Sequence, residues 1–149
     1  MSIRFEHAID VARGPEQIFA VLDDLSQTPR WLARCTGIEK LSPGPNAVGT
    51  RVRYAYREGG RAGTMDGEIK VRTPGERLTM GYADNMMEVV VDFQMTRKDG
   101  GARLTHTIDI RPKSLMAKLF APLVRRQLPQ QTIAAMETLR GLVEGGATS

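Results

Sequence analysis

Apolar and polar residues alternate with a period of two along most of the chain, which is the pattern of strands that bury one face. In the first stretch, residues 2–12, the buried face is predicted to carry Ile3, Phe5, His7, Ile9 and Val11. The same alternation predicts six further strands, over residues 36–41, 49–58, 63–72, 77–82, 86–97 and 102–111. Tight turns such as Asp99-Gly100-Gly101 separate the later strands, so neighbouring strands are expected to run antiparallel.

Three segments have helical features instead. Pro15 suits the first position of a short helix, and Pro29 is predicted to begin a second one that carries Trp31 and Leu32. A long helix is predicted over 114–143, interrupted or kinked at its two prolines. Its apolar stripe, expected to cover the sheet, consists of Leu115, Leu119, Phe120, Leu123, Ile133, Met136, Leu139 and Val143. The sequence therefore predicts an α+β fold in which a curved antiparallel sheet of about seven strands wraps around a long C-terminal helix.

The composition is that of an ordinary globular protein, with 149 residues, 41% hydrophobic and 26% charged. We expect one domain over 1–145 and a disordered tail over 146–149. No apolar run approaches the roughly 20 residues that span a bilayer, no signal peptide is evident, and a single cysteine excludes an internal disulfide. These features predict a soluble, cytoplasmic protein without stable membrane insertion.

The net charge of +4 comes from arginines that are spread along the chain, which favours a solvated basic surface over a nucleic-acid interface. No nucleic-acid partner is predicted, and a homodimer stays open. The basic, amphipathic segment from Lys113 to Arg126 has two interpretations: a helix that packs on the sheet, or a helix that docks on a membrane surface.

Several short segments, in order, resemble the START-like helix-grip superfamily (SRPBCC), and within it the polyketide cyclase/dehydrase and lipid-transport branch. They are Ile9-Asp10-Val11-Ala12, Pro15 to Leu22, Asp24-Leu25, Trp31-Leu32, Val48 to Val52, Gly101 to Thr107, Pro112-Lys113 and Leu119 to Leu123. The resemblance implies a helix-grip fold with two short helices after the first strand, and with the first and last strands adjacent and antiparallel. It implies no catalytic position, because catalytic residues differ between its subfamilies.

Two histidines, His7 and His106, fall on the buried faces of their strands. Each is either a wall residue that holds one hydrogen bond or a general acid or base that faces a ligand. The expected pairing of the first and last strands makes them neighbours. With one cysteine far from both histidines, no metal site is predicted, and no cofactor is expected.

The other inward-facing side chains are aromatic, thioether or aliphatic. Together with His106 they form the predicted ligand-binding set: Tyr54, Tyr56, Met65, Met80, Tyr82, Met87, Val89, Val91 and His106. Cys35 is read as a small buried hydrophobe. The pairs Asp66 with Glu68 and Glu88 with Asp92 fall on exposed faces and are read as solubility residues or cross-strand ion-pair partners. Four arginines are also predicted to face solvent, namely Arg51, Arg53, Arg57 and Arg72.

Two functions follow from this set. The favoured one is binding or transport of a small hydrophobic ligand, such as a lipid, polyketide or aromatic compound, in an internal cavity under the long helix. The alternative is a cyclase or dehydratase that acts on an aromatic or polyketide-like substrate, with His106 or His7 as acid/base.

Overall fold

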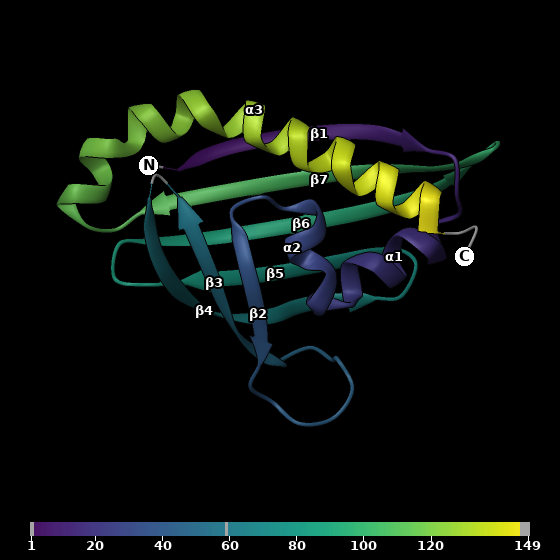
Figure 1. Cartoon of the computed structure of the whole chain (residues 1–149), viewed down its shortest axis with the longest axis horizontal. Coiled ribbons are helices and arrows are strands. Elements are labelled where there is room, and N and C mark those ends of the chain that lie inside the picture. Colours follow the sequence, from purple (N-terminus) through teal and green to yellow (C-terminus); the bar gives the residue numbers. More distant parts are fainter. Residues whose placement is uncertain (1, 59, 147–149) are drawn as a thin grey trace.

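Seven strands form one antiparallel sheet in the order β1-β7-β6-β5-β4-β3-β2 (Figure 1). The computed structural model describes residues 2–58 and 60–146. Its strands are β1 (Ile3–Val11), β2 (Cys35–Lys40), β3 (Arg51–Glu58), β4 (Arg61–Thr73), β5 (Arg77–Ala83), β6 (Met87–Lys98) and β7 (Gly101–Pro112). Its helices are α1 (Pro15–Asp23), the 3₁₀ turn η1 (Leu25–Gln27), α2 (Thr28–Trp31) and α3 (Leu115–Gly146). The predicted helix-grip α+β fold, with short helices after the first strand, is confirmed.

The strand register confirms most of the predicted alternation. On β1 the inward residues Ile3, Ile9 and Val11 are buried, and on β7 every second residue from Ala102 to Ile110 is buried. One correction concerns β4, where the register with β5 shifts between Ile69 and Val71. A bulge inserts one residue and reverses the alternation beyond it. Arg72 therefore turns toward the helices, where it was predicted to face solvent.

The main core lies between the short helices and one end of the sheet. Helix α1 has Pro15 in its first turn and buries Ile18, Phe19 and Leu22. These side chains belong to one cluster with Leu78, Phe93, Met95 and Leu104 of the sheet and with Met136, Leu139 and Val143 of α3. The second half of α3 thus covers the sheet with Met136, Leu139 and Val143, three of the four residues that the sequence predicted there.

The first half of α3 departs from the prediction. The Ser114 hydroxyl accepts a hydrogen bond from the Ala117 N–H, and the helix then runs on through both prolines, bending in Figure 1 but not breaking. Its inward face carries Ala117, Ala121 and Leu128. The residues predicted to cover the sheet here are instead exposed, as is Ile133 farther along: Leu115, Leu119, Phe120, Leu123 and Ile133. The alanines allow the backbone to approach β1 and β7 closely, and this places the larger side chains on the far side of the helix.

Helix α3 reaches the C-terminal end of the described residues. Gly146, the first residue of the predicted tail, is the last residue of α3, and 147–149 lie outside the described residues. Within the described ranges, no helix combines the length and apolar character that a bilayer crossing needs.

Candidate functional site

The inward face of the sheet changes character along its strands. On β6, Phe93 and Met95 are buried, whereas Met87, Val89 and Val91 face the same way but are only half-buried. The buried end packs on α1, which contacts β5, β6 and β7, while α3 lies chiefly over β1 and α2. The half-buried end therefore exposes apolar side chains on the concave side of the sheet. We call this region the open end.

Three tyrosines line the open end from β3 and β5. The Tyr54 ring centroid lies 5.1 Å from that of Tyr82 and 5.9 Å from that of Tyr56. Burial raises the pKa of Tyr54 to about 12 and raises that of Tyr82 further, so both hydroxyls are protonated at neutral pH. The Tyr82 hydroxyl donates to the Met80 sulfur at 3.4 Å. These phenols provide donors within an otherwise apolar surface.

Two glycines of β4 let these rings lie close to the sheet. A Cβ atom on Gly63 would stand 2.6 Å from the Tyr56 hydroxyl oxygen, and one on Gly67 would stand 2.5 Å from Tyr82 Cδ1. Each glycine lies directly opposite its tyrosine in the register. The rings thus occupy the space of the missing side chains.

His106 stands where the buried core meets the open end. Its ring stacks on Phe93 with centroids 4.3 Å apart, and Trp31 meets Phe93 edge-on at 5.9 Å. The His106 Nδ1 atom lies 3.1 Å from the carbonyl oxygen of Asp92 and must donate to it, since a carbonyl only accepts. Burial lowers the pKa of His106 to about 4, so the ring is neutral at pH 7. Its Nε2 atom then carries a lone pair.

His7 lies directly opposite His106 in the pairing of β1 with β7, as the sequence predicted. The two residues share the inward face, and His7 is half-buried on the edge strand, where its ring stacks on Phe5. Two adjacent imidazoles in an apolar wall would repel each other if both were charged, and the neutral state of His106 avoids this repulsion.

One charged residue at the open end was missed by sequence reasoning. The Arg34 guanidinium donates to Gln131 Oε1 of α3 at 2.8 Å, and Gln131 Nε2 donates to Glu58 Oε1 of β3 at 2.9 Å. The positive charge of Arg34 also opposes the rise in the Tyr54 pKa and adds to the fall in the His106 pKa. Arg34 thus connects α3 to the tyrosine cluster. As a single arginine in a loop, it gave no periodic signal.

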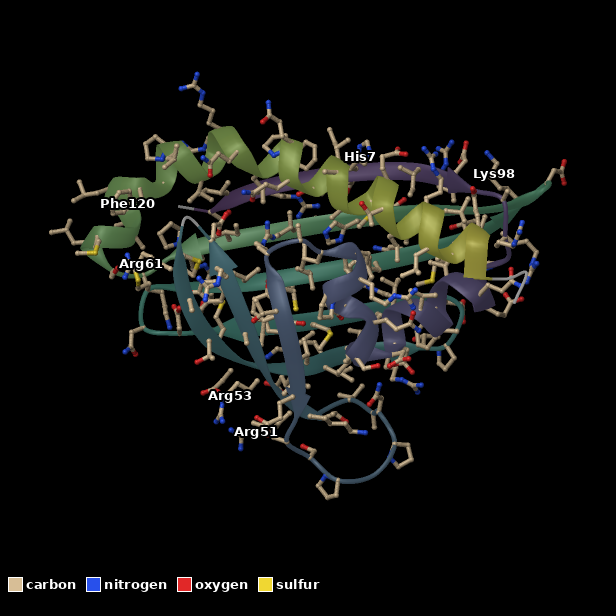
Figure 2. The ribbon with its side chains drawn as sticks, in the orientation of Figure 1. His7, Arg51, Arg53, Arg61, Lys98 and Phe120 are labelled. Carbon is tan, nitrogen blue, oxygen red and sulfur yellow. The ribbon has the colours of Figure 1, made fainter. Side chains whose placement is uncertain are left out.

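The remaining predicted residues lie as follows. Arg51, Arg53 and Arg57 are exposed, and Figure 2 shows Arg51 and Arg53 pointing away from the sheet. Cys35 is buried, which raises the pKa of its thiol. The four carboxylates pair with basic side chains in Arg53–Asp66, Lys70–Glu68, Arg77–Asp92 and Arg111–Glu88.

Two open surface depressions, of about 510 and 630 Å³, lie beside the β6–β7 turn. Their walls include Lys98 and Gly101 and none of the predicted ligand-binding residues. Figure 2 places Lys98 at the opposite end of the molecule from Phe120, near which α3 begins. A ligand cavity under α3 therefore stays a prediction.

Comparison with known proteins gives one family and one fold. The family model described as polyketide cyclase / dehydrase and lipid transport matches residues 2–144. An uncharacterized protein of Mycobacterium tuberculosis is 32% identical over 108 residues, which are 70% of this chain and 63% of that protein. The chain therefore spans less than two thirds of the length of this curated relative.

Solved structures with the same fold share little sequence with this chain. A START superfamily protein from Mycobacterium smegmatis superposes with a TM-score of 0.78 at 15% identity, covering 95% of this chain and 97% of that one. The Zhui aromatase/cyclase from Streptomyces superposes with a TM-score of 0.77 at 15% identity, covering 97% and 94%. At this identity the likeness concerns the fold alone.

Proposed function

Since the chain belongs to the polyketide cyclase/dehydrase and lipid transport family, we propose that it binds a small hydrophobic molecule against the open end of its sheet. The observation that carries this proposal is the partial exposure of Met87, Val89 and Val91 on the inward face of β6. Apolar side chains on the concave side of a sheet bind apolar ligands, because binding removes their surface from water. The ligand class is a lipid, a polyketide or an aromatic compound.

Polar groups around this surface would orient such a ligand. The Trp31 indole N–H is buried and has no hydrogen-bond partner among the described residues. A buried donor without a partner costs roughly 1–3 kcal/mol, which a ligand oxygen would recover. The Tyr54 hydroxyl offers a further donor, and Met80 and Met87 provide adaptable thioether contacts. The Tyr82 hydroxyl would first have to leave the Met80 sulfur. We therefore expect a ligand that is mostly apolar and carries at least one carbonyl or hydroxyl oxygen.

The alternative function, acid/base catalysis by His106 or His7 in a cyclase or dehydratase, rests on the lone pair of His106 Nε2. A general base works best when its pKa lies near the working pH. With a pKa of about 4, His106 is a weak base, and its Nδ1–H is already held by a main-chain carbonyl. The state of His106 therefore favours binding over catalysis by this residue.

Extraction of the purified protein with organic solvent, followed by mass spectrometry, tests the proposal directly. We expect a co-purified apolar compound in about stoichiometric amount. Incubating that compound with the stripped protein then separates the two functions. Recovery of the unchanged compound supports binding, whereas a conversion that is lost in His106→Asn would establish the enzyme.

A pair of variants on β6 locates the site. Val89 faces inward at the open end, and its neighbour Val90 is exposed on the outer face. Val89→Phe would fill the open end. We expect it to weaken binding of the apolar fluorophore anilinonaphthalene sulfonate about tenfold, the effect of losing about two buried methylene contacts. Val90→Phe is the matched control and should leave binding unchanged. Equal binding by both variants would place the site elsewhere.

A further inference from the structure

The first half of α3 presents an apolar stripe to solvent. Leu115 is 77% exposed, Leu119 72% and Phe120 54%. Met116 and Leu123 are also at least half exposed, and the five residues are spaced so that they share one face of the helix. The opposite face, with Ala117, Ala121 and Leu128, packs on the molecule. Burying so many large apolar side chains in a contact would be favourable, and no element of the described chain covers them.

The charged residues within this segment of the sequence have one sign. From Arg111 to Met136 the sequence contains no aspartate or glutamate. It contains five basic residues: Arg111, Lys113, Lys118, Arg125 and Arg126. All five side chains are exposed, and Lys118 and Arg125 lie along one border of the stripe. An exposed apolar stripe bordered by cations is the surface that binds an anionic bilayer interface in the plane of the helix.

We propose that the first half of α3 docks this protein on a membrane surface that contains anionic lipid. The apolar stripe enters the boundary between headgroups and acyl chains, and Lys113, Lys118, Arg125 and Arg126 lie at the level of the phosphates. Arg111 is already paired with Glu88 on the sheet. A second copy of the chain is a poorer occupant. In a symmetric dimer the stripe would meet itself and bring the cations of both copies together, without any acidic residue on this segment to neutralise them.

The position of the stripe relates docking to the open end. Ala121 and Leu128, on the back of the stripe, belong to the same apolar cluster as Met87 and Val89. A membrane under the stripe would therefore lie one helix diameter from the proposed ligand site. Docking itself depends only on the exposed face and its charge, so it can be tested without any ligand.

The test is co-sedimentation of the full chain with phosphatidylcholine vesicles, with and without phosphatidylglycerol. We expect binding to the anionic vesicles, and weaker binding as salt is raised. Leu119→Ser combined with Phe120→Ser should reduce binding at least about tenfold through lost apolar contact. Lys118→Gln combined with Arg125→Gln should reduce it roughly 20- to 30-fold, since each cation at an anionic surface contributes about a fivefold factor.

Two matched controls make the result specific. Val48→Ser removes an apolar side chain that is 65% exposed in the loop between β2 and β3, and Arg51→Gln with Arg53→Gln removes two exposed cations from the sheet. Both should bind as the unchanged protein does, with melting temperatures alike in all variants. Equal binding to neutral and anionic vesicles, or equal losses in controls and stripe variants, would overturn the proposal. Absence of vesicle binding, with a dimer that the Leu119 and Phe120 substitutions dissociate, would replace the membrane by a second copy.

Discussion

Tyr82 of β5 lies directly over Gly67 of β4, the residue opposite it in the sheet. A Cβ atom on Gly67 would stand 2.5 Å from one ring carbon, 2.8 Å from another and 3.0 Å from the carbonyl oxygen of Gly81. Glycine is thus required here because the tyrosine ring occupies the volume of a side chain.

Gly67→Ala should therefore lower the free energy of unfolding by about 1–3 kcal/mol, the usual cost of overpacking. Urea denaturation measures this, and Gly37→Ala on β2 is the control, since a Cβ there would meet nothing within 4 Å. The control should be neutral or slightly stabilising, because alanine suits a strand better than glycine. The same loss in both variants would show that the close approach to Tyr82 does not matter.

Arg72 and Asp23 form the best-buried ion pair among those of the described residues. The Arg72 Nε atom donates to Asp23 Oδ1 at 3.0 Å and the terminal nitrogen to Oδ2 at 2.8 Å, and the guanidinium also lies over the Phe19 ring. Burial alone would raise the pKa of Asp23, but the hydrogen bonds from Arg72 and Asn46 outweigh it and hold that pKa below its usual value.

Removing the guanidinium by Arg72→Met should cost about 1.5–3 kcal/mol, because two charge-assisted hydrogen bonds are lost and Asp23 stays partly buried. Arg53→Met is the matched control, since Arg53 is half exposed and lies 3.8 Å or more from its acidic partners. The control should change the unfolding free energy by less than about 0.5 kcal/mol. Thermal and urea unfolding of both variants would show whether the two arginines differ.

The link from α3 to β3 through Gln131 should also contribute to stability. Gln131→Ala removes hydrogen bonds to Arg34 and Glu58, and we expect a loss of about 1 kcal/mol with faster amide exchange at the end of β3. Gln130, the exposed neighbour on the same helix, provides the control variant Gln130→Ala. Unchanged exchange in both would mean that the link does not hold the two elements together.

The strands and the inward direction of His7 and His106 could be predicted because they depend on local patterns. Alternation with a period of two fixes which residues share a face, and short turns fix which strands are neighbours. The adjacency of β1 and β7, which no turn connects, came from resemblance to the helix-grip superfamily. The inward direction of Tyr54, Tyr56 and Tyr82 followed from the same alternation.

The predictions for Arg72 and for the first half of α3 were wrong, and Arg34 was missed, for other reasons. The bulge near Val71 inserts one residue without any glycine or proline to mark it, so Arg72 was placed on the wrong face. In α3 the helical period identified a stripe at Leu115 and Leu119, but period alone does not say which face meets the sheet. The buried face is the one with Ala117 and Ala121, since close approach of the helix backbone requires small side chains. Arg34 was missed because its position depends on contacts with α3 and β3.

His106 should make the protein less stable in mild acid. Its folded pKa of about 4 lies below the value of 6.5 expected when unfolded, so the unfolded chain binds more protons between these two values. The stabilisation by His106 is therefore complete above pH 6.5 and is lost as the pH falls toward 4. The carboxyl groups of Asp23 and Asp92 have lowered pKa values and lose their stabilisation near pH 4 and below.

The slope between pH 6.5 and 5 therefore reports on His106. We expect the free energy of unfolding, measured by urea titration, to fall by about 1.6 kcal/mol across this range, because the slope approaches 1.36 kcal/mol per pH unit only when the pH lies well below 6.5. His106→Asn keeps a donor near the Asp92 carbonyl but does not titrate, so it should be less stable at neutral pH and should show a much flatter slope. His7→Asn, on the half-buried partner, should retain the slope of the unchanged protein. A slope that persists in His106→Asn and disappears in His7→Asn would contradict this prediction, because the pH dependence would then come from β1. His106 would then again be a candidate acid or base near neutral pH.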